Sequence, residues 1–260
     1  MGSEMCIRDS PKQTLSAQCQ KSLLLSFEKP FRKKQLSGQG SMPRQVTTVG
    51  STAYEKIKKD IIFGELAPDT KLKLDAMKAR YSASISTLRE TLSRLASDGF
   101  VVAEEQRGFF VAPLSREDLM EIADLRILLE CTALKTSVEL GDTDWEANLV
   151  AAYHRLQVSE QKMLGGDESA KETWKRYDCE FHQALISACN SANLLSLHAV
   201  LYDKYLRYQM SVLTNRGAEA VKEHKTMFDA ALKRDAAKAQ DILEKHITRG
   251  LKHTLKAFDT

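Results

Sequence analysis

One aspartate and three histidines have the residue types and the spacing of a metal site built from helices. Asp178 and His182 lie four residues apart in the segment WKRYDCEFHQAL, whose periodicity is helical, so both side chains project from one helix face. His224 and His246 follow downstream, and each lies in a segment with the same periodicity. We expect these four side chains to meet inside a helical bundle and to hold a metal ion.

Three imidazoles and one carboxylate are ligands that suit Zn²⁺, Ni²⁺ or Mn²⁺. An ion with octahedral geometry keeps one or two further positions beside four protein ligands, and a carboxylate from a small molecule can fill them. Cys179 follows Asp178 in the sequence but points about 100° away around the helix, so we do not count its thiol as a ligand. The pattern therefore predicts a divalent metal ion that a small acid can reach.

The part of the chain that must position these side chains is free of proline. Residues 114–260 contain none, and helix interiors exclude proline because it has no backbone N–H. Glycine or asparagine interrupts the apolar periodicity at Gly141, Gly165 and Asn215. Antiparallel helices with short loops make an all-α bundle. The helices are expected over 116–139, 143–164, 169–189, 193–213, 219–233 and 235–257.

The first bundle helix carries an arginine on its apolar stripe. A buried guanidinium is rare, so Arg126 is a candidate for holding the carboxylate of an effector. Glu130 lies one turn further along, and an ion pair inside the helix is the alternative interpretation. Tyr202, Tyr205 and Arg207 on the fourth helix are further candidates for lining the same cavity.

The segment before the bundle has the element order of a winged helix-turn-helix. Helices are expected over 52–63, 75–81 and 86–98. Two β-rich pieces, 100–102 and 109–111, flank a polar turn and predict a hairpin. The order helix, helix, turn, helix, hairpin favours a DNA-binding module of this class.

Composition and charge divide the chain into three parts. Residues 1–47 hold three of the five prolines and a net charge of +5, and we expect a flexible, disordered tail. Met42 is an alternative start, which leaves open whether residues 1–41 are native. Residues 48–113 carry a net charge of +1 and residues 114–260 carry −3. We predict a mainly α protein, with an N-terminal winged helix-turn-helix (α/β) over 48–113 and an all-α antiparallel helical bundle over 114–260.

Several classes of protein are excluded by what the sequence lacks. No apolar run approaches the roughly 20 residues that a membrane-spanning helix needs, and the run at 23–25 is too short for a signal peptide. The five cysteines are an odd number without a C-x-x-C pair, as expected of reduced thiols. We therefore expect a cytoplasmic protein with no membrane partner.

Residues 61–111 resemble the DNA-binding domain of the GntR family of bacterial transcription regulators. The resemblance rests on Gly64, Leu66, Pro68, Leu72, Leu88, Arg89, Glu90, Leu92, Leu95, Gly99, Phe100, Arg107, Gly108 and Phe109. In that family the third helix enters the major groove of the operator, and the tip of the wing reaches the minor groove. The DNA contacts that the resemblance implies are those of Ser84, Ser86, Thr87, Arg89, Arg107 and Gly108.

The physical chemistry of these side chains agrees with the implied contacts. Arg89 stands near the start of the third helix, where an arginine reaches base edges and binds guanine through two hydrogen bonds. Short hydroxyl side chains such as Ser84 suit phosphate contacts at a helix start. A salt bridge from Arg89 to Glu90 is the alternative. Many family members carry an arginine where this chain has Ile85, so the operator preference of the family does not carry over.

Residues 114–258 resemble the FCD-type ligand-binding domain of the FadR subgroup of the GntR family. Many members of this group bind a divalent metal ion with Asp-x-x-x-His on one helix and one histidine on each of two later helices. The residues that match this pattern are Asp178, His182, His224 and His246. The histidines outside the pattern are His154, His198 and His253. The resemblance also implies that the effector is a small organic acid, a carboxylate.

Together the two resemblances imply a transcription regulator whose operator binding responds to a small carboxylate. One recognition helix reads too few base pairs for useful specificity, so we expect a homodimer on a pseudo-palindromic operator in double-stranded DNA. We expect a repressor, with activation as the alternative. A regulator that binds its effector without metal is a second alternative. A metal-dependent enzyme is a third, but the chain has no H-E-x-x-H motif, and we predict that it is not an enzyme.

Overall fold

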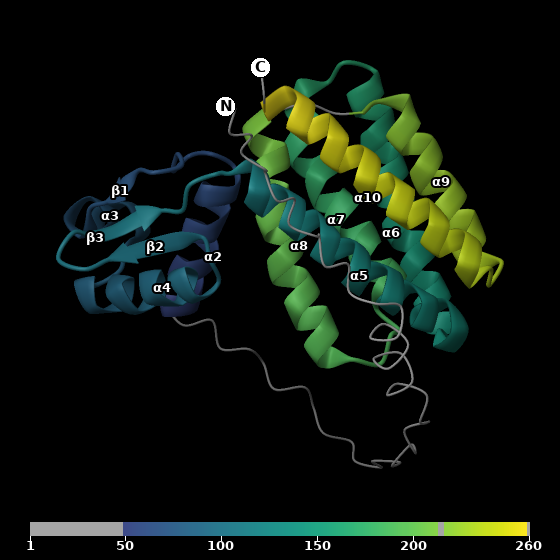
Figure 1. The fold of residues 1–260 in the computed structure, drawn as a ribbon, viewed down its shortest axis with the longest axis horizontal. Coiled ribbons are helices and arrows are strands. Elements are labelled where there is room, and N and C mark those ends of the chain that lie inside the picture. Colours follow the sequence, from purple (N-terminus) through teal and green to yellow (C-terminus); the bar gives the residue numbers. More distant parts are fainter. Residues whose placement is uncertain (1–48, 213–215, 259–260) are drawn as a thin grey trace, which may run out of the picture. The chain divides into compact units, whose positions relative to one another are not determined.

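Helices make up most of the protein in this computed structural model (Figure 1). The structure describes residues 49–212 and 216–258. The tail predicted over residues 1–47 lies outside this described part. Two separate hydrophobic cores organise the described residues, one in the front part of the chain and one in the helical bundle that follows. The mainly α fold class predicted from the sequence is confirmed.

Three helices and a small sheet form the module over residues 49–111 of the described part. The sheet has the order β1-β3-β2 with antiparallel pairing throughout, and β2 and β3 are the two strands of the predicted hairpin. Val101 pairs with Val111, and Glu104 pairs with Gly108. The fold is the winged helix-turn-helix that the sequence predicts. Its elements are α2 (Val49–Ile62), β1 (Lys71–Leu72), α3 (Leu74–Tyr81), α4 (Ile85–Ser97), β2 (Val101–Glu104) and β3 (Gly108–Val111).

The bounds of helix α4 are determined by a capping side chain at its start and by a glycine after its end. The Ser84 hydroxyl accepts a hydrogen bond from the backbone N–H of Thr87 at 3.1 Å. Gly99 follows the helix with a φ of +79°, a left-handed conformation that glycine adopts without steric cost. One face of the helix is fully buried in the front core, and the opposite face is polar. The buried leucines are Leu88, Leu92 and Leu95.

Six α-helices and one short 3₁₀ turn form the described part of the bundle. Their bounds differ by only a few residues from those expected from the sequence, and the all-α prediction for this half is confirmed. No described helix is long and apolar enough to cross a lipid bilayer. The elements are α5 (Arg116–Leu140), α6 (Thr143–Leu164), η1 (Glu168–Ala170), α7 (Lys171–Ile186), α8 (Ala192–Val212), α9 (Ala218–Leu232) and α10 (Ala236–Phe258).

Side-chain caps begin α5 and α6, and one hydrogen bond ties α6 to α7. The Ser115 hydroxyl accepts from the backbone N–H of Asp118 at 3.1 Å. The Asp142 carboxylate accepts from the backbone N–H of Trp145 at 2.9 Å. The indole N–H of Trp145 donates to the backbone carbonyl of Ala184 at 2.9 Å. This bond holds α6 against the helix that carries the predicted aspartate–histidine pair.

Helix α7 lies among other helices on several sides. It packs against α5, α6 and α8, while α9 packs against α6 and α10. Figure 1 shows α10, in yellow, running across the bundle beside α5 and α9. Polar side chains on the inner face of α7 therefore meet partners from neighbouring helices rather than water.

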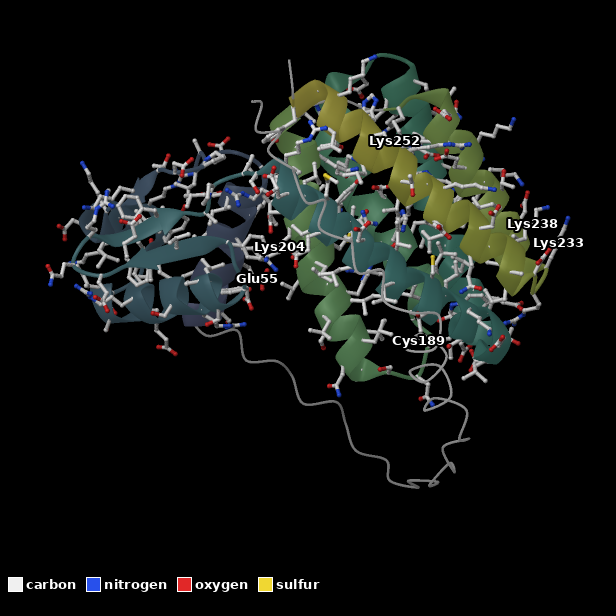
Figure 2. All side chains as sticks on the ribbon, in the orientation of Figure 1. Glu55, Cys189, Lys204, Lys233, Lys238 and Lys252 are labelled. Carbon is white, nitrogen blue, oxygen red and sulfur yellow. The ribbon has the colours of Figure 1, made fainter. Side chains whose placement is uncertain are left out.

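Charged side chains mostly cover the outside of the protein, and a small set is buried. Lys233 and Lys238, at the end of α9 and the start of α10, are exposed and project outward (Figure 2). A buried charge lowers the stability of the fold unless it is paired. The buried charged residues therefore need partners inside the protein. They are Arg126, Glu130, Glu160, Lys175, Asp178, Arg207 and Glu223.

Replacing Leu134 by alanine tests the packing of the bundle core. Leu134 is 0 % exposed, and a Leu→Ala change at such a site lowers the free energy of unfolding by roughly 2–5 kcal/mol, because burial is lost and a cavity remains. Leu128 on the same helix is 61 % exposed, so Leu128→Ala is the matched control, with a change below about 0.5 kcal/mol. Urea denaturation followed by circular dichroism measures both. An equal decrease in the free energy of unfolding of both variants would contradict the burial of Leu134 in the bundle core.

Candidate functional site

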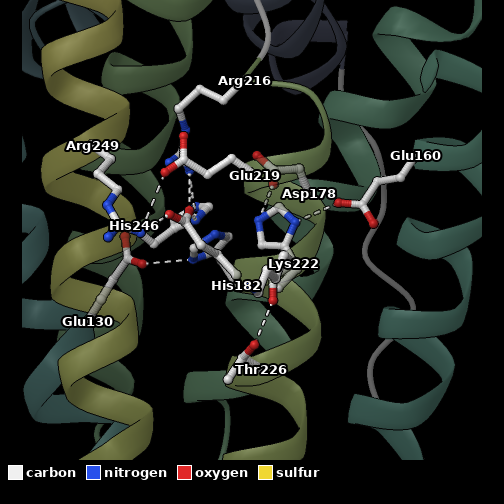
Figure 3. Close-up of polar contacts among 12 residues, drawn as sticks. Glu130, Glu160, Asp178, His182, Arg216, Glu219, Lys222, Thr226, His246 and Arg249 are labelled. Atoms are coloured by element: carbon white, nitrogen blue, oxygen red, sulfur yellow. Dashed lines mark hydrogen bonds and ion pairs between the residues drawn. The ribbon is translucent and has the colours of Figure 1, made fainter.

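The three predicted histidine ligands lie together inside the bundle (Figure 3). His182 comes from α7, His224 from α9 and His246 from α10, and each offers a ligand atom within 4.8 Å of the others. Asp178 lies one turn before His182 on α7, and its Oδ1 is 3.3 Å from Nε2 of His224. The helical spacing read from the sequence thus corresponds to a real cluster in space.

Each of the three histidines is oriented by a glutamate from a different helix. In every case the ring nitrogen next to the glutamate is Nδ1, and both side chains of each pair are largely buried. A carboxylate at Nδ1 fixes both the tautomer and the orientation of the imidazole. The pairs and their distances are Glu130–His182 (3.0 Å), Glu160–His224 (2.6 Å) and Glu223–His246 (2.8 Å).

His246 has a second polar neighbour at the same nitrogen. Nη2 of Arg216 lies 2.9 Å from Nδ1 of His246 and 2.7 Å from the Glu223 carboxylate. One ring nitrogen cannot both accept from the arginine and donate to the glutamate. Since Arg216 already donates to Glu223, we assign the proton to Nδ1 of His246, which donates to the same carboxylate.

This arrangement leaves the Nε2 atoms of the histidines available to a metal ion. Nε2 of His224 is buried and has no hydrogen-bond partner among the described residues. A buried polar atom without a partner costs free energy, and a bound group removes that cost. Three imidazoles with Asp178 beside them are a donor set that fits a divalent ion preferring nitrogen and oxygen. The residues present therefore fit the predicted metal.

Arg126 forms the ion pair with Glu130 and also lines the cavity beside the histidines. Its Nε donates to Oε1 of Glu130 at 2.6 Å, and the two side chains are 4 % and 0 % exposed. Its guanidinium carbon lies 4.5 Å and 4.4 Å from the ring centres of Tyr202 and Tyr205. The same Oε1 lies 3.0 Å from Nε2 of His198, so His198 stands behind Glu130 rather than in the cluster.

Neighbouring charges and hydrogen bonds favour the ionised forms of Glu130 and Asp178. Burial would raise the pKa of Glu130, but the charge of Arg126 and a hydrogen bond from His182 hold this pKa well below its usual range. Burial opposes the charge of Arg126, yet Glu130 raises the pKa of the guanidinium further. Burial would also raise the pKa of Asp178, but the charge of Lys175 opposes this effect, and the pKa of Asp178 is lowered.

Burial lowers the pKa of two histidines of the cluster and so favours their neutral form. The pKa of His246 falls to about 3, although the hydrogen bond to Glu223 opposes the shift. The pKa of His182 is also lowered by burial, against the effect of Glu130. A neutral imidazole is the form that binds a metal ion.

A small cavity opens beside the cluster. Its volume is about 40 Å³, and since one water needs roughly 10–15 Å³ by this measure, the space suits only a few atoms. The predicted ligands line it, and so do Arg126, Tyr202 and Tyr205, which were predicted to line the cavity. The other side chains of the lining with polar atoms are Trp174, Lys175, Gln209, Arg216, His253 and Thr254.

Arg207, which the sequence suggested as an effector-binding residue, lies elsewhere. Its guanidinium donates to the backbone carbonyls of Ala112 and Pro113, where β3 leads into α5. The reason is helical geometry: Tyr202 and Tyr205 are three residues apart and share the cavity face of α8, whereas Arg207 lies about 200° around the helix from Tyr205. We therefore do not retain Arg207 as an effector-binding residue.

Four charged residues of the site were not predicted from the sequence, although helical spacing could have indicated two of them. Lys175 lies three residues before Asp178, which places both on one helix face. Glu160 continues the buried stripe of α6 four residues after Leu156. Glu223 and Arg216 carry no comparable signal, because only the packing of α9 brings them to His246.

The predicted DNA-contacting hydroxyls gather at the start of α4. The Ser84 hydroxyl lies 2.8 Å from that of Ser86 and 2.9 Å from that of Thr87. Arg89 is exposed on the same helix. The alternative salt bridge from Arg89 to Glu90 is not formed among the described residues. The polar face of α4 thus presents hydroxyls and one free guanidinium to solvent.

The predicted wing contacts lie at the turn between β2 and β3. Arg107 is 70 % exposed and forms an ion pair with Glu104, and its guanidinium carbon lies 5.4 Å from the centre of the Phe110 ring. Gly108 has a φ of +96°, and no atom lies within 4 Å of the place where a Cβ would stand. The turn is therefore open to the approach of another molecule.

Comparison with known proteins decides the family. Residues 50–111 match the family model "Bacterial regulatory proteins, gntR family", and residues 121–249 match the model "FCD domain". An uncharacterized HTH-type transcriptional regulator, BphR of Paraburkholderia xenovorans (strain LB400), is 37 % identical over 204 residues, which cover 78 % of this chain and 83 % of BphR. The chain belongs to the GntR family.

Other similar proteins are also transcription regulators. The HTH-type transcriptional repressor GlaR of Escherichia coli (strain K12) is 30 % identical over 208 residues, covering 78 % of this chain and 94 % of GlaR. E. coli McbR/YncC shares the fold, with a TM-score of 0.70 at 18 % identity over 82 % of this chain and 99 % of that one. A putative GntR regulator from Rhodococcus sp. RHA1 gives 0.66 at 20 % identity over 81 % and 99 %. The protein is a GntR transcription regulator with an FCD domain; its relatives are regulators rather than enzymes.

Removing Arg126 tests the buried ion pair. Arg126→Met leaves the Glu130 carboxylate buried without its main counter-charge, and the free energy of unfolding should fall by roughly 3–5 kcal/mol. Arg155→Met is the matched control, because the Arg155–Glu180 pair is 45 % and 36 % exposed and such pairs contribute about 0–1 kcal/mol. Chemical denaturation of metal-free protein measures both. A loss for Arg126→Met no larger than that of the control would contradict the assignment.

Proposed function

We propose that this GntR regulator binds operator DNA through residues 48–113 and senses a small organic acid at a metal site within residues 114–260. The observation that carries the proposal is the glutamate at each histidine Nδ1, together with the buried Nε2 of His224, which makes no hydrogen bond among the described residues. Such an arrangement is what an imidazole needs in order to serve as a metal ligand. The proposed ligands are Asp178, His182, His224 and His246.

The donor set suits Zn²⁺, Ni²⁺ or Mn²⁺. When bound there, such an ion would offer a coordination position to a carboxylate oxygen of the effector. The protein's own side chains supply the geometry: Glu130, Glu160 and Glu223 orient the imidazoles. Tyr202 orients Asp178, because its hydroxyl donates to Oδ2 of that carboxylate at 2.9 Å.

The effector's carboxylate is proposed to bind between the metal ligands and Arg126. Arg126 lines the cavity, and a guanidinium offers five N–H donors, of which Nε is used by Glu130. Tyr202 lines the same cavity and flanks the guanidinium, so it confines both the arginine and the ligand. A small acid fits the small volume of the cavity, whereas a large apolar ligand does not.

Operator binding is proposed for α4 and the wing. The hydroxyls of Ser84, Ser86 and Thr87 suit phosphates, and Arg89 suits a guanine edge in the major groove. Arg107 and Gly108 suit a minor groove, where a basic side chain and an open backbone are favourable. We propose a homodimer on a two-fold symmetric operator, because a single α4 contacts too few base pairs.

Helix α8 gives a physical route from the cavity to the DNA-binding part. Tyr202 and Tyr205 of α8 face the cavity, while Leu206 and Met210 of the same helix belong to the core formed with α2 and α4. A ligand that changes the position of α8 therefore changes the packing of Leu206 and Met210 against α2. We propose repression that the effector relieves, because the relative GlaR is a transcriptional repressor. The regulation requires different effector affinities in the two states.

Removing one proposed ligand tests the metal site. Protein purified without chelator should hold about one divalent ion per chain, and His224→Ala should lose most of it, because a four-ligand site is reduced to three. His154→Ala is the matched control, since His154 is exposed and lies outside the cluster. Elemental analysis of each protein measures the content. If wild-type protein binds a carboxylate with no stoichiometric metal, the metal part of the proposal is wrong.

Removing Arg89 tests the DNA surface. Arg89→Ala should weaken binding to an operator selected from random DNA by roughly 1–3 kcal/mol, or about 5- to 150-fold, because a bidentate base contact is lost. Arg80→Ala is the control within the same module, since Arg80 donates to Asp60 at 2.6 Å. Fluorescence anisotropy at fixed salt measures both. Unchanged operator affinity in Arg89→Ala, with metal content intact, would refute this contact.

A further inference from the structure

We propose that the effector carries a second oxyanion, a carboxylate held by Lys175 and Arg216, so that the regulator senses a short dicarboxylate rather than a monocarboxylate. The inference rests on the proposed function, because the first carboxylate is the one at the metal site. Both cationic residues line the cavity, and neither is a proposed metal ligand. They come from α7 and from the segment just before α9.

The amino group of Lys175 is buried and has donor capacity to spare. The residue is 5 % exposed, and its Nζ donates to Oε1 of Gln209 at 3.0 Å. The nearest carboxylate oxygen, Oδ2 of Asp178, is 3.8 Å away, which is beyond hydrogen-bond distance. Nζ also lies over the Trp174 ring, 4.2 Å from its centre. An ammonium has three donors, so Lys175 can donate to an acceptor in the cavity.

Arg216 likewise has an unused donor. Its Nη2 donates to Glu223 at 2.7 Å, but its Nη1 is buried without a hydrogen-bond partner among the described residues. His253 Nε2, in the same cavity lining, is also buried without a partner there. Leaving such atoms unsatisfied costs free energy. An oxyanion offers acceptors to several donors at once, which one neutral group does not.

The charges that line the cavity point to the same ligand. Three cationic side chains face it, namely Arg126, Lys175 and Arg216, whereas Asp178 is the one carboxylate in the lining. Glu130 and Glu223 stand behind two of these cations and compensate them from the far side. The cavity wall is thus basic where the ligand must lie. Because the cavity is only about 40 Å³, a short chain between the two carboxylates is favoured over a long one.

Titration calorimetry on metal-loaded, full-length protein tests the proposal. The probes are malonate, succinate and glutarate, each compared with the monocarboxylate of equal chain length. The tightest dicarboxylate should bind at least about 10-fold more tightly than its monocarboxylate, because charge-assisted hydrogen bonds are added. Phosphonoacetate in place of malonate shows whether the second oxyanion is better served by a phosphonate. Equal affinities for each pair of probes would overturn the proposal.

Two variants assign the effect to the named residues. Lys175→Met and, independently, Arg216→Gln should each remove most of the dicarboxylate preference while the monocarboxylate affinity stays within about 3-fold. Arg176→Gln is the control on the same helix, with a side chain 61 % exposed, and should keep the preference. Retention of the preference in both test variants overturns the proposal.

The proposed function fails separately from this inference. If metal is absent or no monocarboxylate binds to wild-type protein, the metal-and-acid function itself is wrong, and this inference falls with it. If monocarboxylates bind in a metal-dependent way but dicarboxylates gain nothing, only the second oxyanion is wrong. Metal content and thermal melting of each variant are measured alongside, so that a misfolded variant is recognised and the other variant decides.

Discussion

Buried pairing between glutamates and histidines is the constraint on which the bundle depends. Each of the three imidazoles in the cluster has its Nδ1 against a carboxylate from another helix, at 2.6–3.0 Å. Removing such carboxylates from water is unfavourable unless their hydrogen bonds are formed. The helices must therefore take one relative position to satisfy them, and that position also directs the Nε2 atoms toward one place. The stability of the buried polar network and the geometry of the site have the same cause.

Charge balance links the metal ion to the effector. The charged groups around the cavity are three cations (Arg126, Lys175, Arg216) and four carboxylates (Glu130, Glu160, Asp178, Glu223), whereas the buried Arg207 lies away from it. By formal charge, with the imidazoles left out, this set carries one negative charge in excess, and Arg249, which also contacts Glu223, is 49 % exposed and therefore screened. Under the proposed function, a bound divalent cation would reverse the sign to a net positive charge. It would then add to the attraction that the cations of the cavity wall exert on an anionic effector.

The sequence predicted the helices and the clustering of the histidines better than it predicted their hydrogen-bond partners. Helix spacing sufficed for Asp178 and His182, because residues four apart must share a face, and capping residues and glycines located the helix ends. The partner glutamates come from positions 23 to 64 residues away, and which helix faces pair is decided by packing that no local pattern encodes. Arg207 shows the same limit: it is near Tyr205 in the sequence, but its helical phase directs it to the backbone before α5.

Helix α8 is the element that would couple the site to the DNA-binding part under the proposed function. Cavity residues and front-core residues alternate along one rigid element, with Tyr205 next to Leu206 and Gln209 next to Met210. A helix cannot turn or slide on one face without doing so on the other. Lys58 of α2 adds an ion pair to Asp203 of α8 at 3.0 Å, and Arg207 binds the carbonyls that lead into α5. A ligand that draws Tyr202 and Tyr205 toward the cavity must therefore disturb the contacts that support α2, and α2 packs directly on α4.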